Sequence, residues 1–153
     1  MRGFLARASF ASVLVAAALA AMPADAFQLI TQSEANLPTA PITQISTRGL
    51  TRGPTIDQLA PPPDAVSPVG ALALKITFAG HNGATIDPAS VRVTYLKQPA
   101  VDLTPRLKPY ITATGIDATG VDVPPGVHLI RIDLTDTEGR SSTVIMKLQV
   151  ASN

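Results

Sequence analysis

The sequence predicts an all-β domain, a single antiparallel sandwich of about seven short strands. Two observations favour this fold class. From Pro54 onward, apolar and polar residues alternate in short runs, and turn signals rich in Gly, Pro, Asn and Asp separate the runs about every ten residues. The runs are rich in β-branched residues, which favour strands over helices, and there is no convincing helix. A domain of about ninety residues buries enough apolar surface to fold alone.

The first 26 residues have the pattern of a secretory signal peptide. Arg2 and Arg7 precede an apolar run over positions 10–22, and small residues occupy positions 24 and 26. We therefore expect cleavage after Ala26, a mature chain that begins at Phe27, and a periplasmic or secreted protein. The apolar run is shorter than the roughly 20 residues that span a bilayer, so the mature chain is expected to have no integral membrane span. An uncleaved membrane anchor is the alternative.

The composition restricts the partners of the mature chain. Residues 27–153 carry ten Lys and Arg against ten Asp and Glu, and the whole sequence contains no cysteine. A near-neutral chain of this kind does not favour nucleic acid or an anionic surface as a partner. Because disulfides are excluded, an exported domain of this sequence depends on its hydrophobic core.

Residues 27–53 are expected to form a linker or a loosely ordered arm. They are rich in Thr, Ser, Gln, Pro and Gly, and they show no sustained hydrophobic period. The predicted organisation is a signal peptide at 1–26, this arm at 27–53 and the sandwich domain at 54–153.

Alternation assigns the inward residues of the clearest strands. A short first strand ends at the three prolines of positions 61–63, because consecutive prolines cannot donate to a ladder. Residues 98–112 are irregular, with Thr104 as the N-cap and Pro105 as the first residue of a single helical turn that Pro109 limits. A weaker strand follows near residues 112–118, and the DTEG segment makes a tight hairpin in which Gly139 takes a positive φ. The side chains expected to point inward are Leu72, Leu74, Ile76, Phe78, Val91, Val93, Tyr95, His128, Ile130, Ile132, Leu134, Val144, Met146, Leu148 and Val150.

The segments IDPASVRVTYL and VPPGVHLIRIDLTDTEGR, followed by a last alternating strand, resemble the second half of bacterial immunoglobulin-like domains. The resemblance covers about residues 54–151 and implies an immunoglobulin-like sandwich. It says little about function, since such domains serve as adhesin modules, spacers and accessory domains. His128 stands where this family usually has an aromatic residue, so it either replaces a tyrosine-corner hydrogen bond or removes it. We expect His128 to anchor the base of its strand through a hydrogen bond.

A periplasmic copper carrier is the alternative function. Such carriers are also small exported sandwiches, but they need a histidine near the mature N-terminus and a loop rich in methionine or histidine. Here the mature chain begins FQLITQ, and only Met146 remains after the leader. The sandwich assignment puts His81 and His128 at opposite ends of strands about 20–27 Å long, so they cannot share one metal ion. We therefore expect no metal site and no cofactor.

Motifs for catalysis and for calcium are weak. The chain has no G-x-S-x-G, no H-E-x-x-H and no phosphate-binding glycine loop, so we do not expect an enzyme. The segment DLTDTEG lacks the alternating carboxylates and distal glutamate of a helical calcium loop, and a solvated hairpin explains it better.

Two surface regions are candidates for recognition. The first is the outer face of the sheet built from the third, sixth and seventh strands, where aliphatic and basic groups mix unusually for a solvated face. Its residues are Arg92, Leu96, Leu129, Arg131, Ile145 and Lys147. Either the arm of residues 27–53 covers this face, or a partner protein does.

The second candidate region is the end of the sandwich where the GHNG and DTEGR loops meet. Immunoglobulin-type folds bring such loops together and use them for recognition. Two ordinary polar turns are the simpler interpretation. The residues concerned are His81, Asn82, Asp136, Glu138 and Arg140.

The sequence thus predicts an exported, non-catalytic module that binds or supports a partner protein of the cell envelope. A structural subunit of an envelope assembly is a further hypothesis. The sequence identifies neither the partner nor the oligomeric state.

Overall fold

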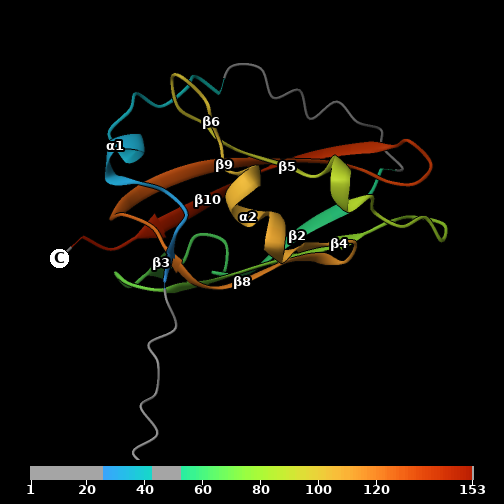
Figure 1. Cartoon of the computed structure of the whole chain (residues 1–153), viewed down its shortest axis with the longest axis horizontal. Coiled ribbons are helices and arrows are strands. Elements are labelled where there is room, and N and C mark those ends of the chain that lie inside the picture. The colour runs from blue at the N-terminus through green and yellow to red at the C-terminus, as the bar shows by residue number, and fades with distance from the viewer. Residues whose placement is uncertain (1–25, 43–52, 153) are drawn as a thin grey trace, which may run out of the picture.

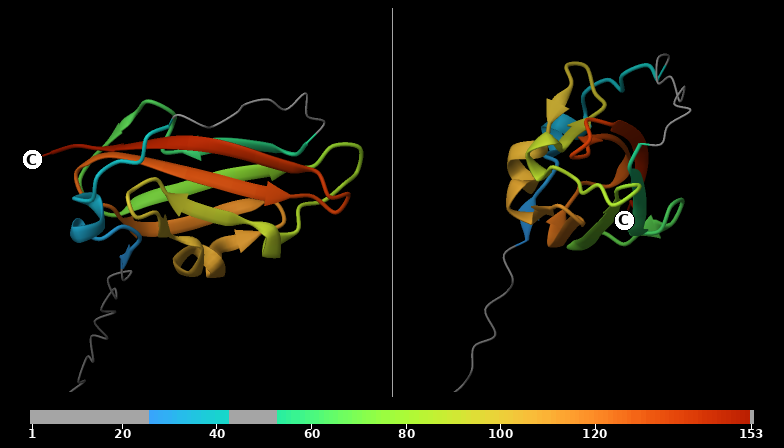
Figure 2. Two further views of the ribbon diagram at one scale, coloured as in Figure 1. Left: turned by 90° about the horizontal axis from the view of Figure 1, so that it is seen from above. Right: turned by 90° about the vertical axis from the view of Figure 1, so that its right-hand side faces the viewer.

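Two β-sheets pack face to face in the part of the protein that the structure describes. The computed structural model describes residues 26–42 and 53–152. Figure 1 shows the sheets as two layers, with the short helix α2 along one side, and Figure 2 shows the same layers from above and from one end. The predicted signal peptide lies outside the described residues except for Ala26, and residues 43–52 of the predicted arm lie outside them as well.

The described chain forms ten strands and four short helical segments. The strands are β1 (Phe27–Gln28), β2 (Thr55–Ala60), β3 (Val66–Ser67), β4 (Leu72–Ala79), β5 (Arg92–Tyr95), β6 (Val101–Asp102), β7 (Ile111–Thr112), β8 (Gly115–Asp122), β9 (Gly126–Thr135) and β10 (Ser141–Val150). The α-helices are α1 (Gln32–Ala35) and α2 (Thr104–Leu107), and the 3₁₀ turns are η1 (Pro88–Ser90) and η2 (Lys108–Tyr110).

Each sheet contains five strands, and both are mixed. The first sheet has the order β1-β8-β4-β2, with β7 also paired to β8, and the second has the order β3-β10-β9-β5-β6. All long pairings are antiparallel, as predicted. The two-residue strands β1 and β3 pair in parallel with β8 and β10, so the prediction of a purely antiparallel sandwich of about seven strands is correct only for the longer strands.

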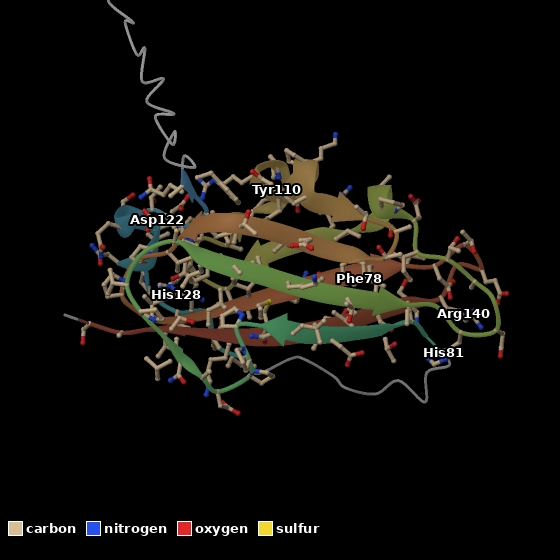
Figure 3. The ribbon with its side chains drawn as sticks, turned by 90° about the horizontal axis from the view of Figure 1, so that it is seen from below. Phe78, His81, Tyr110, Asp122, His128 and Arg140 are labelled. Carbon is tan, nitrogen blue, oxygen red and sulfur yellow. The ribbon has the colours of Figure 1, made fainter. Side chains whose placement is uncertain are left out.

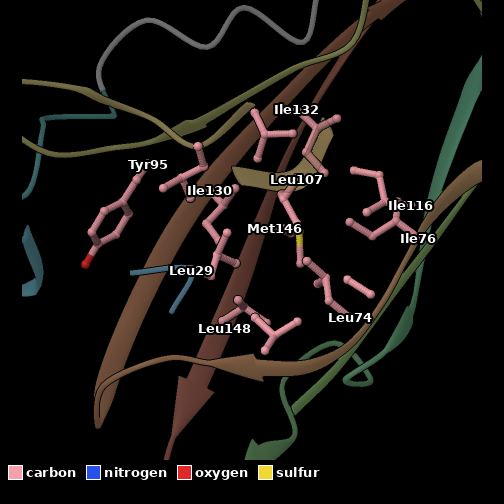
Figure 4. Close-up of a cluster of buried hydrophobic side chains, with 14 of the residues drawn as sticks. Leu29, Leu74, Ile76, Tyr95, Leu107, Ile116, Ile130, Ile132, Met146 and Leu148 are labelled. Carbon is pink, nitrogen blue, oxygen red and sulfur yellow. The ribbon is translucent and has the colours of Figure 1, made fainter. Parts of the chain in front are cut away.

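The predicted inward side chains form the core between the sheets. Alternation over β4, β5, β9 and β10 agrees with burial, and among the predicted set only Val144 is partly exposed. Figure 4 shows side chains from both sheets meeting in this core, with Met146 and Leu148 of β10 near Leu74 and Ile76 of β4. Burying one such side chain contributes about 1.5–3 kcal/mol, so alternation of this kind fixes which face of each strand is inside.

The first part of the predicted arm belongs to the folded domain. Phe27 and Gln28 form β1 on the edge of β8, and Leu29 and Ile30 are completely buried. Helix α1 follows, and its N-cap Thr31 forms a capping box with Glu34. Residues 27–42 are therefore ordered on the sandwich, contrary to the expectation of a loose arm, because a short apolar pair and long-range polar contacts hold them.

The turn after β6 also differs from the prediction. Thr104 is the first residue of α2 rather than its N-cap, which is Leu103. The Thr104 hydroxyl instead accepts from the backbone N–H of Val93 at 2.9 Å, and the Asp102 carboxylate accepts from the Thr104 N–H. The α-helix is a single turn that ends at Leu107, as predicted, but η2 follows it directly and contains Pro109, so Pro109 does not end the helical segment.

Candidate interaction surfaces

His128 lies near the start of β9 with its imidazole inside the protein and 2% of its surface exposed. Its Nε2 is 2.8 Å from the carbonyl oxygen of Pro124, and its Nδ1 is 2.8 Å from the Tyr95 hydroxyl. A carbonyl only accepts, so Nε2 carries the proton and Nδ1 accepts from Tyr95. These bonds confirm the predicted anchor, and they occupy both nitrogens, which leaves His128 no lone pair for a metal ion.

Burial sets the protonation of this pair. Desolvation lowers the pKa of His128. The hydrogen bond to Pro124 opposes this shift only in part, and the nearby charge of Lys97 lowers the pKa further. Burial, with a smaller effect from Glu34, raises the pKa of Tyr95 to about 12. At neutral pH the pair is an uncharged link between β9 and β5.

Lys97 fastens the N-terminal segment to the sandwich. Its ammonium group donates to the carbonyl oxygens of Ala35 and Leu37 at 2.9 and 2.8 Å and to the Thr39 hydroxyl at 3.4 Å. It also lies 5.3 Å from the centre of the Tyr95 ring, within cation–π range. All three ammonium protons have acceptors, so this lysine is a structural clamp.

A second clamp joins α1 to α2. The Arg106 guanidinium makes two bonds to the Glu34 carboxylate, at 2.7 and 2.8 Å, and also donates to the Leu29 carbonyl. The bond from Arg106 lowers the pKa of Glu34 to about 2, although burial opposes the shift. The planar guanidinium suits this two-point contact, which a lysine cannot reproduce.

The GHNG and DTEGR loops meet at the opposite end of the sandwich, as predicted. In Figure 3, His81 and Arg140 lie at one end and His128 lies toward the other. Arg140 bridges the loops by donating to the His81 carbonyl at 2.9 Å and pairing with Asp136 at 2.8 Å and Glu138 at 2.9 Å. The structure therefore brings the two loops together through Arg140, and it confirms that the two histidines lie far apart.

Asp136 was predicted to be part of a solvated recognition loop, but it is buried. Its Oδ1 accepts from the backbone N–H groups of Glu138 and Arg140, and its Oδ2 accepts from the Arg140 side chain. Burial opposes ionisation of this carboxyl group, but these hydrogen bonds outweigh it, so its pKa lies below the usual range. The carboxylate is used to hold the hairpin, while His81, Asn82 and Glu138 remain exposed.

All six residues predicted for the outer face lie on the outer side of the sheet formed by β10, β9 and β5. Arg131 lies between Thr94 and Ile145, and Leu129 lies opposite Lys147. The backbone N–H of Leu96 donates to the Leu129 carbonyl. The six side chains are exposed or half-buried. Their role in binding stays a prediction.

This face is less basic than the sequence indicated. Arg131 pairs with Asp133 at 2.8 Å, and Lys147 pairs with Asp64 at 2.6 Å. Asp133 also accepts from the Thr143 hydroxyl. These exposed pairs contribute at most about 1 kcal/mol each, but they neutralise two of the three basic groups. The aliphatic residues thus distinguish this face more than its charge does.

Two exposed valines extend the face beyond the predicted residues. Val66 of β3 and Val127 of β9 lie opposite Gln149 of β10, one on each side of it, and their exposed fractions are 63% and 55%. Val127 is two residues from Leu129 on the same side of β9. We call the set Val66, Leu96, Val127 and Leu129 the aliphatic patch. Val127 alternates with the inward His128 and was detectable from that pattern, whereas Val66 joins the patch only through the parallel pairing of β3.

One edge of the same sheet is open over much of its length. Strand β3 pairs with β10 only at Gln149 and Val150, so within residues 26–42 and 53–152 no strand lies beside Ser141–Leu148 on the side away from β9. A groove of about 410 Å³ runs between this edge and β2. Its apolar lining comes from both sheets and includes Ile56, Ile76, Ile132, Val144 and Met146.

Comparisons with protein-family models, with curated proteins and with solved structures found no match to this chain. In the part of the chain that the structure describes, no helix is long and apolar enough to cross a membrane, and no three His, Cys, Asp or Glu side chains are grouped to hold a metal ion.

Proposed function

We propose that this protein is an exported, immunoglobulin-like module that binds a partner protein of the cell envelope and catalyses no reaction. The observation that carries the proposal is the aliphatic patch. Side chains from β3, β9 and the residue after β5 lie on the outer face of one sheet, with Val66 and Val127 more than half exposed. Exposed apolar side chains that gather among polar groups on one face are typical of protein interaction sites.

The strand order supports the immunoglobulin-like assignment. Constant-type immunoglobulin domains place strands A, B, E and D in one sheet and C, F and G in the other. The pairings of β2, β4, β8 and β7, and those of β5, β9 and β10, correspond to these two sets in chain order. His128 near the start of β9 also bonds back to the Pro124 carbonyl four residues upstream, as the tyrosine of a tyrosine corner does.

Site-specific photo-crosslinking in cells tests the proposal. A photoreactive residue at Val127 is expected to yield a discrete adduct with another envelope protein. The same residue at Asp117, which is exposed on β8 of the other sheet, is the control and is expected to yield none. Adducts of equal yield at both positions, or none at Val127, would contradict the proposal. The N-terminal sequence of the exported protein is expected to begin at Phe27.

A further inference from the structure

Strand β10 differs from the other sheet edges in the described residues because its first six residues carry nothing that discourages pairing with a further strand. Exposed edges are normally protected by charges, prolines, bulges or shortness. Strands β1, β3, β6 and β7 have two residues each, and β2 carries Asp57, a register shift between Gln58 and Ala60, and a proline at each end. By contrast, β10 pairs with β9 over ten consecutive residues without a shift, and Ser141–Met146 contains no charge, proline or glycine.

The free edge presents a regular row of backbone groups. The N–H of Asp136 donates to the Arg140 carbonyl. This bond identifies which residue pairs of the β9–β10 ladder exchange backbone hydrogen bonds. By the two-residue period, Ser142, Val144 and Met146 direct their backbone groups toward β9. Ser141, Thr143, Ile145 and Lys147 therefore direct theirs to the open side, as does Ala151, whose N–H donates to Ser67 of β3. Four residues thus offer a donor and an acceptor each.

The groove beside this edge adds room for side chains. An aliphatic and aromatic cavity of about 150 Å³ holds a benzene molecule, so about 410 Å³ takes roughly two large apolar side chains. Its floor is apolar, and its rim carries Asp57, Asp64 and Lys147. The Lys147–Asp64 pair crosses one end of the edge, but both side chains are well exposed, so the pair is weak and easily displaced.

A second copy of this chain does not suit the groove. If two β10 edges paired, the inward side chains of the partner strand would be its own Val144 and Met146. Both are already packed in the core of their own molecule, where Met146 is 4% exposed. They cannot also fill a neighbour's groove. An extended segment that has no core of its own is free to place alternate side chains there.

We propose that the open edge of β10 binds an extended segment of a partner protein as an added strand. The segment pairs with the backbone of Ser141, Thr143, Ile145 and Lys147 and places alternating apolar side chains in the groove between β10 and β2. Backbone bonds give such a contact its affinity, and the side-chain pockets give it specificity. This inference rests on the proposed function, because it names how a partner is held beside the aliphatic patch.

A peptide titration of the ¹⁵N-labelled protein tests the inference. The probe is an eight-residue peptide of alternating threonine and valine with a lysine at each end, and a peptide of the same composition with the valines in one block is its control. We expect the alternating peptide to shift the amide signals of Thr143 and Ile145 and to slow their hydrogen exchange at least tenfold. No shift at these amides up to millimolar peptide would overturn the inference.

Two variants in β2 separate groove binding from a general effect. Ile56→Glu puts a charge into the groove and is expected to weaken peptide binding at least tenfold. Leu59→Glu changes an exposed residue of the same strand that does not line the groove, and it is expected to bind normally. Equal effects of both variants would contradict the assignment. Val144→Thr, which nearly keeps the side-chain shape, provides the same test if Ile56→Glu fails to fold.

The outcomes also distinguish this inference from the proposed function. If the Thr143 and Ile145 amides are protected in a concentration-dependent way without peptide, a second copy occupies the edge and the inference is wrong. If the peptide does not bind but the Val127 crosslink forms, only strand addition fails. If Val127→Glu abolishes peptide binding while Ile56→Glu does not, the segment lies on the patch and not in the groove.

Discussion

At the scale of single residues, His128 shows how little a residue type says about its use. A histidine beside several acidic residues in the sequence is a natural metal or catalytic candidate. The fold separates them, because β9 carries His128 at one end and the hairpin with Asp136 at the other. The imidazole instead links β9 to β5 through Tyr95 and to the turn before β9 through Pro124. Its position before an alternating inward run was enough to predict a structural anchor, although the Tyr95 partner was not foreseen.

Replacing His128 should destabilise the protein strongly. His128→Phe keeps a ring in the space but leaves the Pro124 carbonyl and the Tyr95 hydroxyl without their partner. Each unpaired buried group costs about 1–3 kcal/mol of the free energy of unfolding. Urea denaturation measures the loss, and His81→Phe, an exposed change at the other end, is expected to stay within about 0.5 kcal/mol. If His128→Phe lost no more of the free energy of unfolding than His81→Phe, the two hydrogen bonds of His128 would not stabilise the fold.

The same residue should make stability fall in mild acid. Because the folded-state pKa of His128 is lowered, the unfolded chain binds a proton first as the pH drops through about 6.5. Stability from this group is therefore complete well above pH 6.5 and decreases as the pH falls below that value. The carboxyl groups with lowered pKa values act at lower pH, since their contribution is lost only as the pH falls below the ordinary pKa values of 4.5 for Glu34 and 3.8 for Asp136. Unfolding midpoints at several pH values should show this decrease in the native protein and a flatter profile in His128→Phe.

At the scale of elements, the N-terminal segment shows the limit of local patterns. Two buried residues and a four-residue helix give no detectable period, so composition favoured a loose arm. The Thr31 and Glu34 capping box was a usable signal for the start of α1. The groups that fix the segment, Lys97 and Arg106, lie more than fifty residues away in the chain. No local reading of residues 27–42 reveals such contacts.

Loss of the Arg106 clamp should loosen this segment before it unfolds the sandwich. Arg106→Met removes the two-point bond to Glu34 and the bond to the Leu29 carbonyl, and it should cost about 1–2 kcal/mol, because the pair is partly exposed. Faster hydrogen exchange is expected at the amides of Leu29 and Ala35, with little change in β9. Arg131→Met, which breaks a more exposed pair, is the control and should leave those two amides unchanged.

At the scale of the whole molecule, alternation predicted the layers and the inward faces, but it did not predict the edges. The inward set from Leu72 to Val150 follows from side-chain period alone. Which strand lies at an edge depends on pairing between distant segments, here β2 with β4 and β3 with the last two residues of β10. The outer face could therefore be predicted from parity, whereas the open edge, the groove and the place of Val66 in the patch could not.

We propose that the outer edge of β10, which no strand among residues 26–42 and 53–152 covers, is open for binding, and hydrogen exchange along β10 in the free protein tests this most directly. We expect an alternating pattern. The amides of Ser142, Val144 and Met146, which face β9, should be strongly protected, and those of Thr143 and Ile145, which face the open side, should exchange at least a hundredfold faster. Equal protection of both sets, at a protein concentration where the chain is monomeric, would mean that the chain covers its own edge and would contradict the claim.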